Sequence, residues 1–474
     1  MNTKMIRYIL CRMLGVEAVL LMIPVIVAAL YQEMSGIAFL IPAGILLLLF
    51  FLAGVKKPEQ SHIYGKEGMV IVALAWILWS LFGAMPFTIS GFIPNYMDAF
   101  FETVSGFTTT GSSILRDVEA LPQCLLFWRS LTHWIGGMGV LVFVLVLTSL
   151  DKKNSMYLMR AEVPGPEKDK LVPKAMSTAR ILYGMYLIMT VVEIIFLMLG
   201  GVNLFDSMIF SFGSAGTGGF SNYADSVAHF HSAYIDGVIT TFCALFGVNF
   251  SLFYFMLLGD FKSVRKIMLI VGATALITLN IHSMFPSMIK AFRYAIFQVV
   301  TVITTTGYAT TDFAKWPMFS KSILMMLTVV GACASSTGGG IKVSRLLVGI
   351  KCIKREIVQL AHPKSVGIIR IGGKKVGSDI LRTIYIYFIA YVGILIVSVM
   401  LVSLDNFDFE TTFSAVLTTL GNVGPGMAKV GPMGNFADFS ILSKLVLCFD
   451  MLAGRLEIFP FLVLFTAPAW RRKF

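Results

Sequence analysis

Long apolar stretches recur along the whole chain, separated by polar connections. A helix that crosses the roughly 30 Å hydrocarbon core of a bilayer needs about 20 mainly apolar residues. Stretches close to that length lie near residues 14–31, 36–53, 68–90, 121–150, 183–203, 233–258, 267–286, 318–350, 380–404 and 437–468. The pattern therefore predicts an all-α membrane protein with ten transmembrane helices.

After the first two spans, the sequence repeats one unit four times. Each unit has an apolar span, a shorter half-apolar stretch that ends at a glycine, and a second apolar span. The aligning glycines are Gly111, Gly219, Gly307 and Gly424. The shorter stretch cannot cross the membrane, and irregular backbone at that depth is tolerated only in protein or beside a water-filled path. We expect four pseudo-fourfold repeats of helix, re-entrant pore loop and helix around one pore.

The repeat divides the chain into five parts. Two accessory helices and four pore repeats are predicted at residues 1–60, 61–160, 161–262, 263–360 and 361–474. Asp98 and Asp206 begin the short helices of the first two repeats, where an acidic residue suits a helix N-terminus. The other two repeats lack this acid, so the repeat is degenerate.

The segments around the four glycines have the composition of a cation filter. Backbone carbonyls aligned inward can replace the hydration shell of a cation. Glycine makes the required backbone conformation accessible, and threonine adds a hydroxyl acceptor. We name these four stretches the glycine segments. Their residues are Thr108, Thr109, Thr110 and Gly111; Gly216, Thr217, Gly218 and Gly219; Thr304, Thr305, Thr306 and Gly307; and Gly421, Asn422, Val423 and Gly424.

Composition and charge agree with a membrane protein. Hydrophobic residues make up 57% of the chain and charged residues 14%, whereas soluble domains carry about 25% charged residues. The net charge of +12 comes from basic residues near the N-terminus and in alternate connections, while residues 201–236 contain no Lys or Arg. This positive-inside pattern predicts that both termini are cytoplasmic. The basic charge therefore indicates a lipid bilayer as partner, and no nucleic acid.

Catalytic and metal-site signatures are lacking in the sequence. It has no H-E-x-x-H or G-x-S-x-G motif, and its six cysteines form no C-x-x-C pair. His229 and His231 lie in an outer loop, and two histidines do not make a metal site. We expect neither an enzyme nor a bound cofactor.

The eighth predicted span is interrupted at residues 331–340, which contain no bulky side chain. If the helix begins near residue 319, the break lies about 18 Å along it. That depth is near mid-membrane, on the cytoplasmic side of the glycine segments, where irregular backbone lines a pathway. We expect a flexible gate that includes Gly338, Gly339 and Gly340. The alternative is a small-residue face for tight helix packing.

Arg455 lies deep in the tenth predicted span and needs a partner or water there. Asp450 and Glu457 do not share its helix face at 100° per residue. We expect Arg455 to point into the pore beneath the glycine segments and to act in gating. A structural ion pair with another helix is the alternative.

Other polar residues fall within or beside the predicted spans. We expect them to make satisfied interhelical contacts, although a place in an ion path stays open. These residues are Glu17, Glu193, Asn249 and His282. Asp117, Asp225 and Asp312 follow the glycines and either concentrate cations at an outer mouth or are ordinary solvated loop residues.

Several motifs resemble one transporter family over essentially the whole chain. They are FTTTG at 107–111, HWIGGMG at 133–139, GTGGFS at 216–221, TTTGY at 304–308 and NVGPG at 422–426. The sequence resembles the TrkH-type membrane subunit of the Trk/Ktr potassium transporter superfamily. The two extra N-terminal spans favour the TrkH type over the shorter KtrB type.

The resemblance implies potassium uptake across the cytoplasmic (inner) membrane. It further implies a homodimer, control by a cytosolic nucleotide-binding regulator similar to TrkA, and an intramembrane loop that obstructs the pore near the matching arginine. K+ is then the transported ion, with Rb+ and to some degree Na+ as substitutes. The implied ligands are Thr109, Thr110, Thr217, Gly218, Thr305, Thr306, Asn422 and Val423.

The second and fourth glycine segments depart from the Thr-Thr-Thr-Gly pattern, so we expect weaker K+ over Na+ selectivity than in tetrameric potassium channels. An ion-coupled secondary transporter, a K+/Na+ or K+/H+ symporter, is the alternative function. Such folds also use broken helices near mid-membrane, but they usually pair two repeats that are often inverted.

Overall fold

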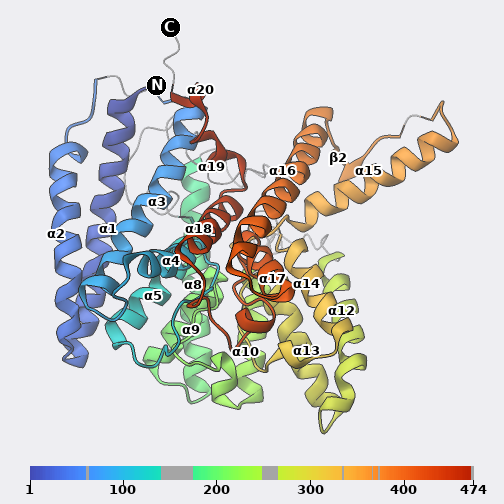
Figure 1. The fold of residues 1–474 in the computed structure, drawn as a ribbon, viewed down its shortest axis with the longest axis horizontal. Coiled ribbons are helices and arrows are strands. Elements are labelled where there is room, and N and C mark those ends of the chain that lie inside the picture. Colours follow the sequence, from blue (N-terminus) through green and yellow to red (C-terminus); the bar gives the residue numbers. More distant parts are fainter. Residues whose placement is uncertain are drawn as a thin grey trace.

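The computed structural model describes residues 1–59, 63–139, 175–247, 265–333, 336–365, 367–371 and 374–470. This part of the chain is predominantly helical, as predicted, and many of its helices run between two opposite ends of the molecule (Figure 1). Its strands are the two-residue pair β1 (Arg370–Ile371) and β2 (Lys374–Lys375). The N-terminus and α20 (Ala467–Trp470) lie at the same end.

An N-terminal hairpin packs along one side of the molecule (Figure 1). It consists of α1 (Thr3–Tyr31), a 3-10 turn (Met34–Phe39), α2 (Leu40–Leu49) and a π turn (Phe50–Gly54). The Glu33 carboxylate between its two helices accepts hydrogen bonds from the backbone N–H groups of Gln123 (2.7 Å) and Cys124 (3.0 Å). The first N–H groups of a helix lack partners within the helix. Glu33 therefore caps the first turn of α5 (Gln123–Gly137) and connects the hairpin to the rest of the fold.

The rest of the described chain contains four groups of three helices, and in each group the middle helix precedes one of the four glycines. The groups are α3 (Gly65–Ile89), α4 (Tyr96–Phe107) and α5 (Gln123–Gly137); α8 (Ala175–Leu199), α9 (Leu204–Gly216) and α10 (Ala233–Phe246); α12 (Arg265–Ile281), α13 (Met288–Ile303) and α14 (Met318–Val330); and α16 (Ser378–Val402), α17 (Phe409–Leu420) and α18 (Ile441–Arg455). Asn95, Asn203, Ser287 and Asp408 cap the four middle helices through their side chains. The Thr411 hydrogen bonds hold the pKa of Asp408 below its usual value.

The ten predicted spans are not reproduced as stated. In the described ranges, five segments are long and apolar enough to cross a membrane: Thr3–Tyr31, Met34–Gly54, Gly65–Ile89, Arg180–Leu199 and Ser378–Asp405. The predicted spans 121–150 and 233–258 extend beyond the described residues.

Two other predicted spans are interrupted by backbone turns. The 437–468 span breaks after Arg455, where Glu457 and Ile458 have φ values of 53° and 67°, a break that hydropathy does not detect. Pro460 lies in the first turn of the helix that follows, α19 (Phe459–Val463). The 318–350 span breaks after Val330, as predicted, and continues only as α15 (Val343–Ala361), which projects from the bundle (Figure 1).

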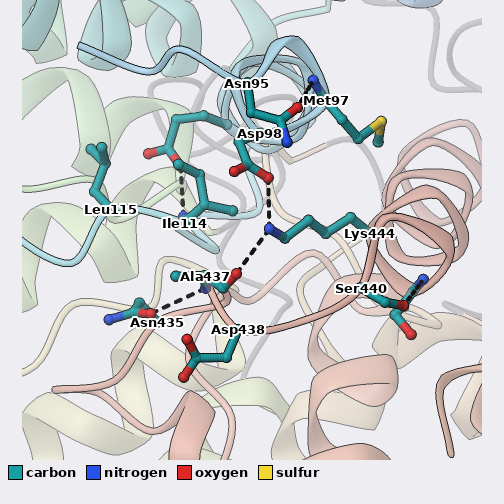
Figure 2. Close-up of polar contacts among 12 residues, drawn as sticks. Asn95, Met97, Asp98, Ile114, Leu115, Asn435, Ala437, Asp438, Ser440 and Lys444 are labelled. Carbon is teal, nitrogen blue, oxygen red and sulfur yellow. Dashed lines mark hydrogen bonds and ion pairs between the residues drawn. The ribbon is translucent and has the colours of Figure 1, made fainter. Parts of the chain in front are cut away.

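A largely buried ion pair joins the first helix group to the last. Figure 2 shows the Lys444 ammonium between the carboxylate of Asp98, at 2.6 Å, and the backbone carbonyl of Ala437, at 2.9 Å. The N–H of Phe436 also donates to the Ser113 carbonyl at 2.8 Å. These contacts close the chain on itself at the start of α4 and α18.

We predict that Lys444→Met lowers the thermal stability of the purified protein in detergent. The substitution leaves the Asp98 carboxylate without its charged donor, a loss of about 2–3 kcal/mol. Arg116→Met is the matched control, because the Arg116–Asp438 pair (2.5 Å) is largely exposed and contributes at most about 1 kcal/mol. Equal apparent Tm values for the two variants would contradict a structural role for the Asp98–Lys444 pair.

Candidate functional site

The four glycine segments meet at the C-terminal ends of α4, α9, α13 and α17, and each contacts the next in a closed cycle. A side-chain carbon added at each glycine would collide with the backbone carbonyl oxygen just before the glycine of the next segment. The contacts run from Gly111 to Gly218, from Gly219 to Thr306, from Gly307 to Val423 and from Gly424 to Thr110. The same position is used four times, so the four backbones surround one axis.

The four segments share one backbone conformation although their side chains differ. The glycines Gly111, Gly219, Gly307 and Gly424 have φ values of 83°, 77°, 80° and 96°. Two residues earlier, Thr109, Thr217, Thr305 and Asn422 have φ values of 54°, 55°, 60° and 52°. A positive φ is uncommon outside glycine and persists only when the surrounding structure holds it in place. The sequence analysis anticipated the glycines but not the second left-handed position.

Side-chain hydrogen bonds distinguish the segments from one another. Threonine hydroxyl groups pair within the first segment (Thr108 with Thr110, 2.8 Å) and within the third (Thr304 with Thr306, 2.9 Å). In the fourth segment, the Asn422 amide instead donates to the Thr110 hydroxyl at 3.0 Å. The segments are therefore equivalent in backbone path and unequal in polar lining, as their sequences predicted.

A buried ion pair that the sequence analysis missed lies behind the first two segments. Arg129 Nε is 2.6 Å from Glu102 Oε1, and both side chains are almost fully buried. Glu102 also accepts from the Ser113 hydroxyl and the Ile114 N–H, both at 2.9 Å, while Arg129 donates to the Ser221 carbonyl at 2.8 Å. The pair thus holds the loops that follow the first two glycine segments. An arginine inside the apolar run 124–135 was the available signal, because a buried charge needs a partner.

All four glycines line a cavity of about 130 Å³ on the side opposite the helix ends. Asp117, Asp225 and Asp312 are not among its lining residues. Asp117 accepts from the Glu119 N–H at 3.0 Å, and Asp312 pairs with Lys315 at 3.2 Å. These contacts favour the solvated-loop alternative. His229 pairs with Asp225 at 3.6 Å, and the described residues contain no cluster of three potential His, Cys, Asp or Glu metal ligands.

On the side of the helix ends, the described residues of the 331–340 loop, which are 331–333 and 336–340, pack directly against the glycine segments. Backbone hydrogen bonds join the two ends of this loop, from Lys342 N–H to Val330 O (3.1 Å) and from Ala332 N–H to Gly339 O (3.3 Å). The Gly339 N–H also donates to the Thr305 hydroxyl at 2.7 Å. A side-chain carbon at Gly338 or Gly339 would collide with the backbone of the third or fourth segment, so the loop lies as close as two backbones allow.

Arg455 joins this loop to α5. Its guanidinium donates to the carbonyls of Thr337 in the loop and of Gly136 and Gly137 (2.8 Å to Gly137) at the end of α5. The two acids excluded by helix geometry bind elsewhere, Asp450 with Ser398 (2.7 Å) and Glu457 with Arg345.

Lys342 is a further loop contact that the sequence analysis missed. Its buried ammonium donates to the Gly338 carbonyl, and its backbone φ is 79°. The signal was a lysine two residues after the glycine run 338–340, within a predicted span. The loop is therefore held by cations that bind its backbone carbonyls from two helices.

The prediction that the polar span residues make satisfied interhelical contacts is wrong for Glu17. This residue is fully buried, and its carboxyl oxygens have no hydrogen-bond partner among the described residues. Glu193 of α8 is also fully buried and lies beside Ser214 of α9. His282 lies in an exposed turn, where its Nδ1 contacts the Leu279 carbonyl at 2.7 Å. Asn249 lies outside the described residues.

We predict that Gly307→Ala disrupts the glycine segments. Alanine is strained at a φ of 80°, and its methyl group would collide with the Val423 carbonyl. The backbone conformation alone costs about 1–2 kcal/mol. Gly272→Ala is the control, because a methyl group added to α12 there meets nothing within 4 Å. Thermal melting and cation uptake both measure the effect, and unchanged values for Gly307→Ala would contradict the close packing.

Comparisons with known proteins place the chain in a family. Residues 38–279 and 266–471 match the TrkH family, described as cation transport proteins. The Trk system potassium uptake protein TrkH of Salmonella typhimurium is 35% identical over 465 residues, 95% of this chain and 96% of that protein. TrkG of Escherichia coli, also named a Trk system potassium uptake protein, is 30% identical over 99% of this chain and 100% of that one.

A solved structure agrees with these relatives. The crystal structure of the potassium transporter TrkH from Vibrio parahaemolyticus matches with a TM-score of 0.89 and 31% identity, covering 99% of this chain and 100% of that chain. The resemblance read from the sequence is confirmed, as is the expectation of a multi-pass membrane transporter that is not an enzyme. The chain belongs to the TrkH family of cation transport proteins.

Proposed function

We propose that the chain carries K+ into the cell through a carbonyl filter formed by the four glycine segments. The observation that carries this proposal is the closed cycle of glycine-to-carbonyl contacts, which brings four similar backbones around one axis. The names of the relatives supply the ion. In this proposal, residues 1–60 are accessory, and pseudo-fourfold pore repeats occupy 61–160, 161–262, 263–360 and 361–474. Ten spans cross the membrane, some of them interrupted.

The ion is held by carbonyl and hydroxyl oxygens. Each glycine segment begins at the C-terminal end of a short helix, and helix dipoles place partial negative charge there. The proposed ligands are Thr109, Thr110, Thr217, Gly218, Thr305, Thr306, Asn422 and Val423. Because Asn422 and Val423 interrupt the threonine pattern, we propose a K+ preference over Na+ that is weaker than in tetrameric potassium channels.

The 331–340 loop, with Gly338, Gly339 and Gly340, serves as the gate in this proposal. It lies directly beneath the third and fourth glycine segments. Gly338 and Gly339 approach these segments most closely, and Gly340 packs against Gly331 within the loop. Arg455 holds the loop closed by binding the Thr337 carbonyl. Opening then requires the loop to break many weak backbone contacts at once. Such a loop can switch between a closed and an open state.

Partners are proposed from exposed surfaces. The projecting helix α15 carries an exposed apolar row, Ile350, Ile353 and Ile357, and a second copy of the chain would cover it in a homodimer. The basic residues near α15 offer a surface to a cytosolic nucleotide-binding regulator similar to TrkA. Both termini are proposed to lie in the cytoplasm, with the protein in the inner membrane.

A second candidate function is K+/H+ symport. Glu193 is the observation that favours it, because this carboxyl is fully buried within the long apolar helix α8. Ionisable groups inside the membrane often mark ion or proton pathways. No comparable feature among the described residues favours K+/Na+ symport.

Reconstitution of the purified chain in liposomes tests the proposed function. With imposed K+, Rb+ or Na+ gradients, we predict rapid Rb+ uptake, slower Na+ uptake and no net proton movement. Proton movement that follows K+ and is lost in Glu193→Gln would establish the symport alternative. Equal K+ and Na+ rates would refute K+ preference, and absence of any flux in folded, open-gate variants would refute the channel proposal.

We predict that Arg455→Gln raises basal Rb+ flux. The substitution removes the charge that binds three backbone carbonyls of the loop and of α5, so the closed loop loses stability relative to other conformations. Arg180→Gln on the exposed surface of α8 controls for loss of a positive charge. Flux equal to that of the control would assign Arg455 to structure and contradict the gate.

A further inference from the structure

An apolar groove of about 400 Å³ lies between the N-terminal hairpin, α3 and the C-terminal α20. Ile6, Leu10 and Leu14 of α1 line one wall. The other lining residues include Leu49 of α2, Phe82 of α3 and Trp470 of α20. Its surface is almost entirely apolar. None of these features takes part in the proposed ion path.

The groove has the length and direction of a lipid chain. Its α1 wall extends from Thr3 to Leu14, about 16 Å at 1.5 Å per residue. Because α1 crosses the membrane, the groove runs along the membrane normal from the end where the N-terminus and α20 lie. That end meets the membrane–water interface, where tryptophan is typical.

The mouth of the groove is basic. Arg7 lines it, and Lys4 is exposed one turn earlier on the same helix. Among the described residues, no acidic side chain lines the groove. An apolar channel with a basic rim at the interface complements an acyl chain joined to a negatively charged headgroup.

We propose that this groove binds one acyl chain of an anionic phospholipid, with its phosphate at Arg7. A zwitterionic lipid would fill the apolar walls equally well, but it would gain less from the basic rim. The inference depends on α1 crossing the membrane and is independent of K+ transport, so failure of either proposal leaves the other standing.

Native mass spectrometry of the delipidated full chain tests this site with palmitoyl-oleoyl phosphatidylglycerol and phosphatidylcholine. We expect phosphatidylglycerol to bind more tightly, and Arg7→Gln to weaken it by about fivefold, the effect of one interfacial cation. Lys56→Gln, an exposed lysine outside the groove, should change little. Equal binding of the two lipids, or equal effects of the two variants, would overturn the proposal.

Trp470 provides a second readout at the same place. Phosphatidylglycerol with brominated acyl chains should quench tryptophan fluorescence, and the quenched fraction should fall in Trp470→Phe. Leu10→Trp, which fills the groove, should reduce lipid binding in protein that elutes as a single folded species. Quenching that is unchanged in Trp470→Phe would show that the lipid binds elsewhere.

Discussion

The contact between each glycine Cα and the carbonyl oxygen of the next segment is the constraint on which the structure depends. Four backbones approach so closely that a methyl group fits at none of the four positions. This closeness requires a left-handed backbone at two positions in every segment. The surrounding helices supply the support, through the Arg129–Glu102 pair behind the first two segments and the Asp98–Lys444 pair that joins the last group to the first.

Sequence periodicity predicted the parts of this arrangement that depend on local composition. The four glycines, the short helices before them and the interruption at residue 331 all follow from residues near one another in the chain. Hydropathy overstated the continuity of the helices, because the turn at Glu457 and Ile458 consists of residues that are common in helices.

Contacts between residues far apart in the sequence could not be predicted from local composition. The Glu102–Arg129 pair, the Glu33 cap and the Lys342 contact each join groups whose proximity is set by the assembled fold. The Glu17 carboxyl, which is buried without a hydrogen-bond partner among the described residues, was misread for the same reason, since the sequence places it in a span but does not show what surrounds it. Backbone strain at Thr109 and Thr305 is likewise imposed by neighbouring segments and leaves no mark on residue type.

The Glu33 cap gives the N-terminal hairpin a role beyond filling space. Gln123 and Cys124 begin α5, and the opposite end of that helix offers the Gly136 and Gly137 carbonyls to Arg455. A protein that retained the four helix groups and lacked the hairpin would expose two unsatisfied amides at the N-terminal end of α5. It would need an acceptor from another loop. Otherwise α5 could shift along its axis, and such a shift would also move the Gly136 and Gly137 carbonyls that bind Arg455.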